Sequence, residues 1–118
     1  MKEAEVRSRA KQFAIVVLEV CKEIDTHGGN GVLVNQITRS ATSIGANIHE
    51  ANYAASKADF ANKLQIALKE CYETEYWVDL MEAVGCITTD CKNQLLQESG
   101  TIRRMLVKAI NTVKEGKE

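Results

Sequence analysis

The side chains of this 118-residue chain that could hold a metal are few, and their spacing fits no metal motif. The two histidines are His27 and His49. His49 and Glu50 are followed by Tyr53 at the position where a zinc-protease motif has its second histidine, so that motif fails. A di-iron site in a helical bundle needs Glu-x-x-His pairs on facing helices, which these histidines do not supply. We therefore expect no metal and no cofactor.

Catalytic groups are equally scattered. Ser40 and Ser43 have no histidine placed by sequence to activate them as nucleophiles. Glu75, Asp79 and Glu82 share one helical face, as runs of solvent-exposed charges commonly do. The four cysteines are irregularly spaced, which is typical of small core residues rather than zinc ligands: Cys21, Cys71, Cys86 and Cys91. We expect no enzyme activity.

Basic residues gather near both ends of the chain and are the candidates for binding nucleic acid: Arg7, Arg9, Lys11, Arg103, Arg104 and Lys108. In an antiparallel bundle the two groups would meet in one patch, which predicts weak, salt-sensitive binding to RNA or DNA. Four glutamates near the same ends oppose this: Glu3, Glu5, Glu115 and Glu118. An ordinary solvated surface of mixed charge stays the alternative.

The composition indicates one globular domain spanning residues 1–118. Apolar residues make up 45% and charged residues 26%, the net charge is −1, and there is no proline. Proline is the residue that a helix interior tolerates least, so its absence favours long helices. We find no signal-peptide pattern at the charged start and no apolar run of membrane-spanning length, which predicts a cytoplasmic protein without a membrane partner.

Apolar residues recur at alternating spacings of three and four over residues 6–24, 34–51, 60–81 and 95–113. This is the core-facing side of an amphipathic helix, repeated four times. Helices this long with short connections predict an all-α, up-down-up-down antiparallel four-helix bundle. Because Gly100 weakens the last segment, a three-helix hairpin with a broken fourth element stays open as an alternative.

Local signals mark the helix boundaries. The segment 27–31, HGGNG, ends the first helix. Ser56 followed by Asp59 resembles a capping box that starts the third, and Gly85 ends it. Either Thr88 or Thr89 caps the fourth.

The second helix has unusually little charge, because Arg39 and Glu50 are the only charged residues from 32 to 55. A polar stripe beside its apolar side carries small hydroxyls and amides, and Gly45 and Ala46 would let another backbone approach. We predict that Arg39 and Glu50 are paired within or between chains, and that a second copy of the chain covers the stripe. The oligomer-interface candidates are Gln36, Arg39, Ser40, Ser43, Asn47 and Glu50. A central bundle helix with satisfied core polar groups is the alternative.

Three aromatic residues cluster in the third helix: Tyr72, Tyr76 and Trp77. Bulky aromatics at helical spacing mostly fill space in a core or an interface, which is the role we predict. A platform for stacking nucleic-acid bases would need these rings to be exposed.

The run QITRSATSIGANIHE, residues 36–50, resembles the signature of four-helix-bundle proteins encoded in intervening sequences of bacterial 23S ribosomal RNA genes. Ser56, Asp59-Phe60, LQIALKE (64–70) and ETEYW (73–77) match that pattern too, and the accessory variability determinant of diversity-generating retroelements resembles the same group. The likeness covers the whole chain and is most specific over residues 36–81. Ala51 departs from it, since the family usually has glycine there, so we expect a more continuous helix at that point.

The resemblance implies a homo-oligomeric ring, typically a pentamer. We predict a non-enzymatic assembly or adaptor role for it. For relatives associated with retroelements the resemblance also implies binding to RNA or DNA and to a reverse transcriptase as partner. A purely structural protein–protein interaction module with no nucleic-acid partner is the alternative function.

Overall fold

The structure, a computed structural model, describes residues 3–116, with side chains from residue 5 onward, so Glu118 and the side chain of Glu3 lie outside the described part. Within it the chain forms four α-helices and no strand: α1 (Glu3–Thr26), α2 (Gly31–Ala51), α3 (Lys57–Ala83) and α4 (Thr89–Lys114). Helix α4 runs unbroken through Gly100, which rules out the three-helix alternative. The predicted four-helix fold is confirmed.

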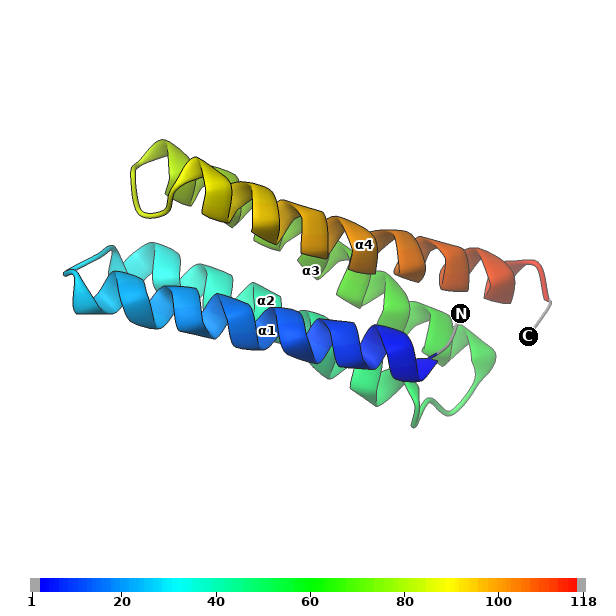
Figure 1. Cartoon of the computed structure of the whole chain (residues 1–118). Coiled ribbons are helices and arrows are strands. Elements are labelled where there is room, and N and C mark those ends of the chain that lie inside the picture. Colours follow the sequence, from blue (N-terminus) through cyan, green and yellow to red (C-terminus); the bar gives the residue numbers. More distant parts are fainter. Residues whose placement is uncertain (1–2, 117–118) are drawn as a thin grey trace.

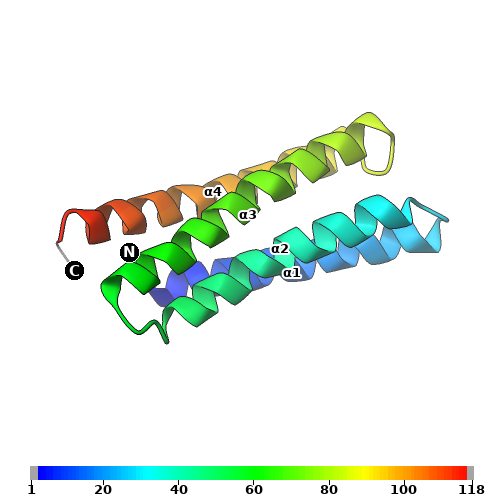
Figure 2. The ribbon, with the colours of Figure 1, turned by 180° about the vertical axis from the view of Figure 1, so that it is seen from behind.

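The helices form two antiparallel pairs, α1 with α2 and α3 with α4, in a bundle of 48 × 22 × 19 Å (Figure 1). Helix α2 packs on α1 and α3, and of the four neighbouring pairs α1 and α4 share the smallest contact. The two pairs diverge toward the end that holds the α1–α2 and α3–α4 loops, as the view from behind also shows (Figure 2). The α2–α3 loop lies at the other end.

The alternating apolar residues form the core as predicted. The residues that recur at spacings of three and four over 6–24, 34–51, 60–81 and 95–113 are all buried, except for three that are half-buried: Val20, Phe60 and Val113. Large side chains such as Phe13 and Ile44 are less than 3% exposed. Burying this apolar surface is the main force that holds the four helices together.

Side chains cap the starts of α2, α3 and α4. Asn30 accepts hydrogen bonds from two backbone N–H groups in the first turn of α2, at 3.0 and 3.2 Å. Ser56 accepts from the N–H of Asp59, whose carboxylate in turn accepts from the N–H of Ala55, both at 3.1 Å, so the predicted capping box is present in a slightly shifted form. Thr88, rather than Thr89, caps α4.

Glycines with positive φ follow α1 and α3. Gly28 has a φ of +72° and Gly85 a φ of +83°, a conformation that glycine adopts without steric strain. Helix α2 ends at Ala51, and five residues separate it from Lys57, so the expected continuation of the helix is wrong. Asn52 keeps a right-handed backbone, with φ of −64°, and the turn needs no glycine.

Candidate functional site

The polar stripe of α2 that sequence reasoning assigned to a second copy faces α3 of the same chain. Ser40 is fully buried, and its hydroxyl accepts a hydrogen bond from Thr74 of α3 at 2.8 Å. The prediction that Ser40 contributes to an oligomer interface is therefore wrong, because no partner could reach it without separating α2 from α3.

The two charged residues of α2 also pair with α3 and not with each other. Arg39 contacts Glu70 at 3.5 Å and is hydrogen-bonded to Glu73. Glu50 accepts a hydrogen bond from Lys63 at 2.8 Å, which raises the pKa of that lysine. The predicted pairing of Arg39 with Glu50 is wrong within the chain, since eleven residues of helix separate them by about 16 Å.

The remaining members of the stripe are half-buried: Gln36, Ser43 and Asn47. Ser43 donates to the carbonyl of Arg39 at 2.7 Å, and Asn47 donates to the carbonyl of Ser43 at 2.9 Å. Among the described residues, every buried side-chain nitrogen and oxygen has a hydrogen-bond partner. The alternative of satisfied polar groups within one bundle thus describes this side of α2.

Two of the six basic candidates are held in ion pairs with carboxylates. Arg9 lies 3.8 Å from Glu5 and from Glu98 of α4. Arg103 donates to Glu75 of α3 at 3.1 Å, which raises the pKa of its guanidinium. The other four are exposed: Arg7, Lys11, Arg104 and Lys108.

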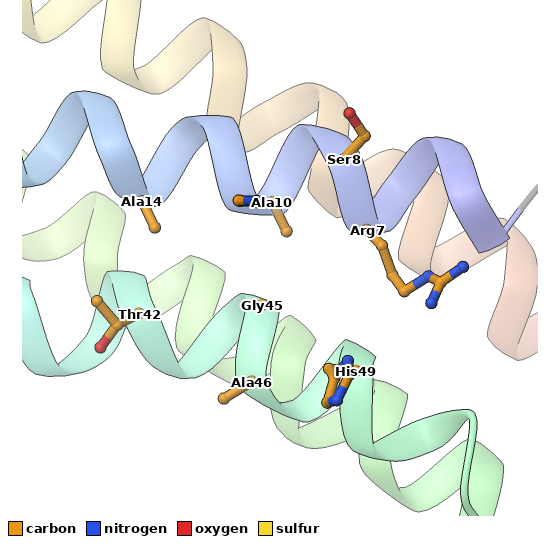
Figure 3. A pocket seen from close by; sticks show the side chains of 9 residues that line it. Arg7, Ser8, Ala10, Ala14, Thr42, Gly45, Ala46 and His49 are labelled. Carbon is orange, nitrogen blue, oxygen red and sulfur yellow. The ribbon is translucent and has the colours of Figure 1, made fainter.

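An open groove runs between α1 and α2 on the side away from α3 and α4 (Figure 3). Its volume is about 540 Å³. Small side chains line much of it, from Ala10 and Ala14 on α1 and from Thr42, Gly45 and Ala46 on α2. Because these side chains are short, the two helices leave space that longer ones would fill.

Positive and titratable side chains border the same groove. Arg7 and Lys11 come from α1, and His49 comes from α2. Lys11 forms no ion pair within residues 5–116. The ring of Tyr53 packs against the His49 ring in a tilted arrangement, with the ring centroids 5.5 Å apart, and Tyr53 is 77% exposed. The groove therefore combines an uncharged floor with a positive rim.

Gly45 of α2 faces Ala10 of α1. A methyl group added at Gly45 would lie 3.6 Å from the side chain of Ala10, an ordinary contact distance, so an alanine would also fit at this position. The close approach predicted from Gly45 and Ala46 is thus made at Gly45 by the chain's own α1. Ala46 remains exposed. Ala46 shares this exposed stripe with Thr42 and His49, whereas the sequence analysis placed the interface on the neighbouring polar stripe.

The tyrosines of α3 lie on the surface. Tyr72 is 54% and Tyr76 59% exposed, whereas Trp77 is half-buried and donates to Glu73 at 2.9 Å. Arg103 of α4 lies over the ring of Tyr72, 5.4 Å from its centroid. Core packing is therefore wrong for the two tyrosines, and an interface role stays a prediction.

The acidic residues expected on one face of α3 pair with side chains of α4. Glu75 accepts hydrogen bonds from Ser99 at 2.7 Å and from Arg103, and Asp79 pairs with Lys92 at 3.0 Å. Burial raises the pKa of the Cys71 thiol to about 12, which makes it a poor nucleophile near neutral pH. In residues 5–116 no three His, Cys, Asp or Glu side chains gather to hold a metal ion.

Comparison with known proteins points to one family. The family model described as 23S rRNA-intervening sequence protein matches residues 2–108. A crystal structure of a protein with unknown function from the S23 ribosomal protein family of Bacteroides thetaiotaomicron VPI-5482 superimposes with a TM-score of 0.92. It is 41% identical and covers 95% of this chain and 100% of its own. No curated protein matches the chain. None of the helices described here is apolar over a length that would cross a membrane.

Proposed function

This chain belongs to the family of 23S rRNA-intervening sequence proteins, and on that premise we propose that it is a non-enzymatic module that assembles with copies of itself. The assembly is the five-membered ring that the family resemblance implies. In the cytoplasm such a ring would act as a structural module or an adaptor.

The observation that supports self-assembly is the outer side of α2. Between Arg39 and Glu50 the helix has no charged residue, and Thr42, Ala46 and His49 of this segment are exposed beside the groove. A helix face that stays in water normally carries lysine or glutamate, and uncharged exposed faces more often lie at interfaces. Since α3 covers the other polar stripe, this is the part of α2 that a partner can reach.

The mass of the native protein in solution tests the proposal. We expect light scattering coupled to gel filtration, at micromolar concentrations, to give about five times the 13.1 kDa of the chain. Sedimentation velocity over a hundredfold range of concentration should show dissociation only at the dilute end. A monomer mass throughout this range would refute the proposal.

Weak binding of RNA or DNA is a second candidate function, and exposed basic residues favour it. Arg104 and Lys108 lie one turn apart on α4 and are both exposed. A ring would repeat this pair in every subunit, so several weak phosphate contacts could act together. The net charge of −1 favours the alternative of a structural module without nucleic acid.

Fluorescence anisotropy with a structured RNA and a DNA duplex separates the two functions. We expect binding at about 50 mM salt that weakens steeply at higher salt. The variant Arg104→Glu/Lys108→Glu should abolish it, whereas Lys22→Glu, also on an exposed position, should not. Wild-type protein that binds neither probe at low salt would leave the purely structural function.

A further inference from the structure

Two surface features of this chain are candidates for contact with each other: a groove and a pair of exposed tyrosines. The groove between α1 and α2 is concave and floored by small side chains. Tyr72 and Tyr76 project from α3, in the other helix pair, with more than half of each side chain exposed. One chain therefore carries both a recess and two large, rigid aromatic groups that could fill a recess.

Resting on the proposed self-assembly, we propose that Tyr72 and Tyr76 of one copy seat in the α1–α2 groove of the next copy. The interface is then heterologous, which means that each chain contributes a different face to each of its two neighbours. Repeating such a contact with a rotation that closes generates a ring.

The size of the groove fits this occupant. Its volume of about 540 Å³ accommodates two aromatic side chains. The space exists because the side chains of Ala10, Ala14 and Ala46, which line the groove, end at the first carbon. Leu18 continues the same stripe of α1 one turn beyond Ala14 and is 44% exposed, which extends the apolar surface. Buried tyrosines at the centre of an interface commonly contribute much of its binding free energy.

The charges fit as well. Arg7 and Lys11 border the groove, and cations favour the faces of aromatic rings; Arg103 makes such a contact with Tyr72 within the chain. From Glu70 to Glu82 helix α3 has five carboxylates and no basic residue. Three cations from α2 and α4 pair with all five carboxylates. With the exposed Lys69, one turn before Tyr72, this part of the surface keeps a small negative net charge.

The same charges disfavour symmetric pairing. A groove against a groove would bring the Arg7 and Lys11 side chains of two copies together and leave both recesses without a side chain to fill them. A tyrosine face against a tyrosine face would leave both grooves empty and bring together two surfaces that each carry a small negative net charge. Like charges across an interface are unfavourable, so groove against tyrosines is the favoured combination.

Mixing two defective variants tests the proposal. The tyrosine variant is Tyr72→Ala/Tyr76→Ala, and the groove variant is Lys11→Glu/Ala46→Trp. All four positions are exposed, so each variant should keep the far-UV circular dichroism of the wild type. Loss of each tyrosine should raise the concentration for half-assembly roughly 30-fold, and each variant alone should be a monomer at micromolar concentration.

A mixture of the two variants should form a dimer containing one chain of each kind. The tyrosine variant keeps an intact groove and the groove variant keeps intact tyrosines, so one interface can form and no further chain can be added. Light scattering would show twice the mass of the chain, and a tag on one variant would capture the other in equal amount. As matched controls, Lys22→Glu and Ala58→Trp at exposed positions should keep the wild-type mass.

The possible outcomes separate self-assembly from the interface proposed for it. A monomeric wild type would refute self-assembly and the interface together. A wild type that assembles, with a tyrosine variant that keeps the wild-type mass, would refute only the interface. Two monomeric variants that remain monomeric when mixed would also refute it, because a heterologous contact must be restored by mixing.

Discussion

The buried hydrogen bond between Thr74 and Ser40 gives a direct test of how α2 and α3 are held together. Both side chains are fully buried, and the Thr74 hydroxyl donates to the Ser40 hydroxyl at 2.8 Å. Ser40 in turn donates to the carbonyl of Ile37, at 3.4 Å. The two residues therefore form a short chain in which Ser40 is the acceptor that Thr74 needs.

This geometry predicts unequal effects of removing either partner. Ser40→Ala leaves the Thr74 hydroxyl buried without its acceptor, which should lower the free energy of unfolding by about 1–3 kcal/mol. Thr74→Val conserves shape and leaves Ser40 its bond to the Ile37 carbonyl, so we expect a loss of roughly 1 kcal/mol. The double variant replaces both hydroxyls by apolar groups and should be more stable than Ser40→Ala alone.

Urea unfolding of the four proteins, each at the same chain concentration, measures this cycle. Trp77, the only tryptophan, is half-buried near Thr74 and reports the transition by fluorescence. Ser43→Ala serves as a control, because that half-buried hydroxyl bonds only to a carbonyl of its own helix, and its loss should be within about 0.5 kcal/mol. A double variant whose loss equals the sum of the single losses would refute the reasoning, since no coupling would then exist between the two hydroxyls.

Three other expectations concern single sites. Burial, with the Glu75 carboxylate adding to it, raises the pKa of Cys71 to about 12. The unfolded thiol ionises above pH 9 while the folded one stays protonated, so urea titrations from pH 8 to 10.5 should show wild type losing roughly 2 kcal/mol relative to Cys71→Ala. Arg39→Ala should lower the free energy of unfolding by less than about 1 kcal/mol, because the arginine is 49% exposed, and the effect should shrink in about 1 M salt when unfolding is repeated there. Gly100→Ala should raise it by roughly 0.5 kcal/mol in a thermal melt. The helix gains up to about 1 kcal/mol from the alanine, but the added methyl would meet the guanidinium groups of Arg104 and Arg103 at 3.3 and 3.4 Å, and Arg103 is held by Glu75.

The sequence predicted the inward side of each helix, because a period near 3.6 places apolar residues on one face whatever surrounds them. It also predicted the caps at Ser56 and Gly85, which depend on local backbone hydrogen bonds and conformation. These features need no knowledge of the neighbouring helices. They could therefore be predicted from the amino-acid sequence alone.

The direction of the polar stripe of α2 could not be read in the same way. Periodicity shows that Ser40, Ser43 and Asn47 share a face, but it does not say whether α3 or another molecule lies opposite. The deciding signal is on α3, where Thr74 supplies a buried partner and Glu70 and Glu73 supply charges for Arg39. Matching polar residues between the two helices would have assigned this stripe to the bundle.

The part of α2 that lacks charged residues without a reason inside the chain is therefore smaller than the sequence suggested, and it lies at one place on the surface. Helix α3 accounts for the stripe that contains Ser40, and α1 accounts for the close contact at Gly45. What stays unexplained within one chain is the exposed, uncharged stripe of Thr42, Ala46 and His49 beside the groove. Short side chains on this stripe leave space that a neighbouring copy would fill, so the groove is where we expect the proposed assembly to bury surface.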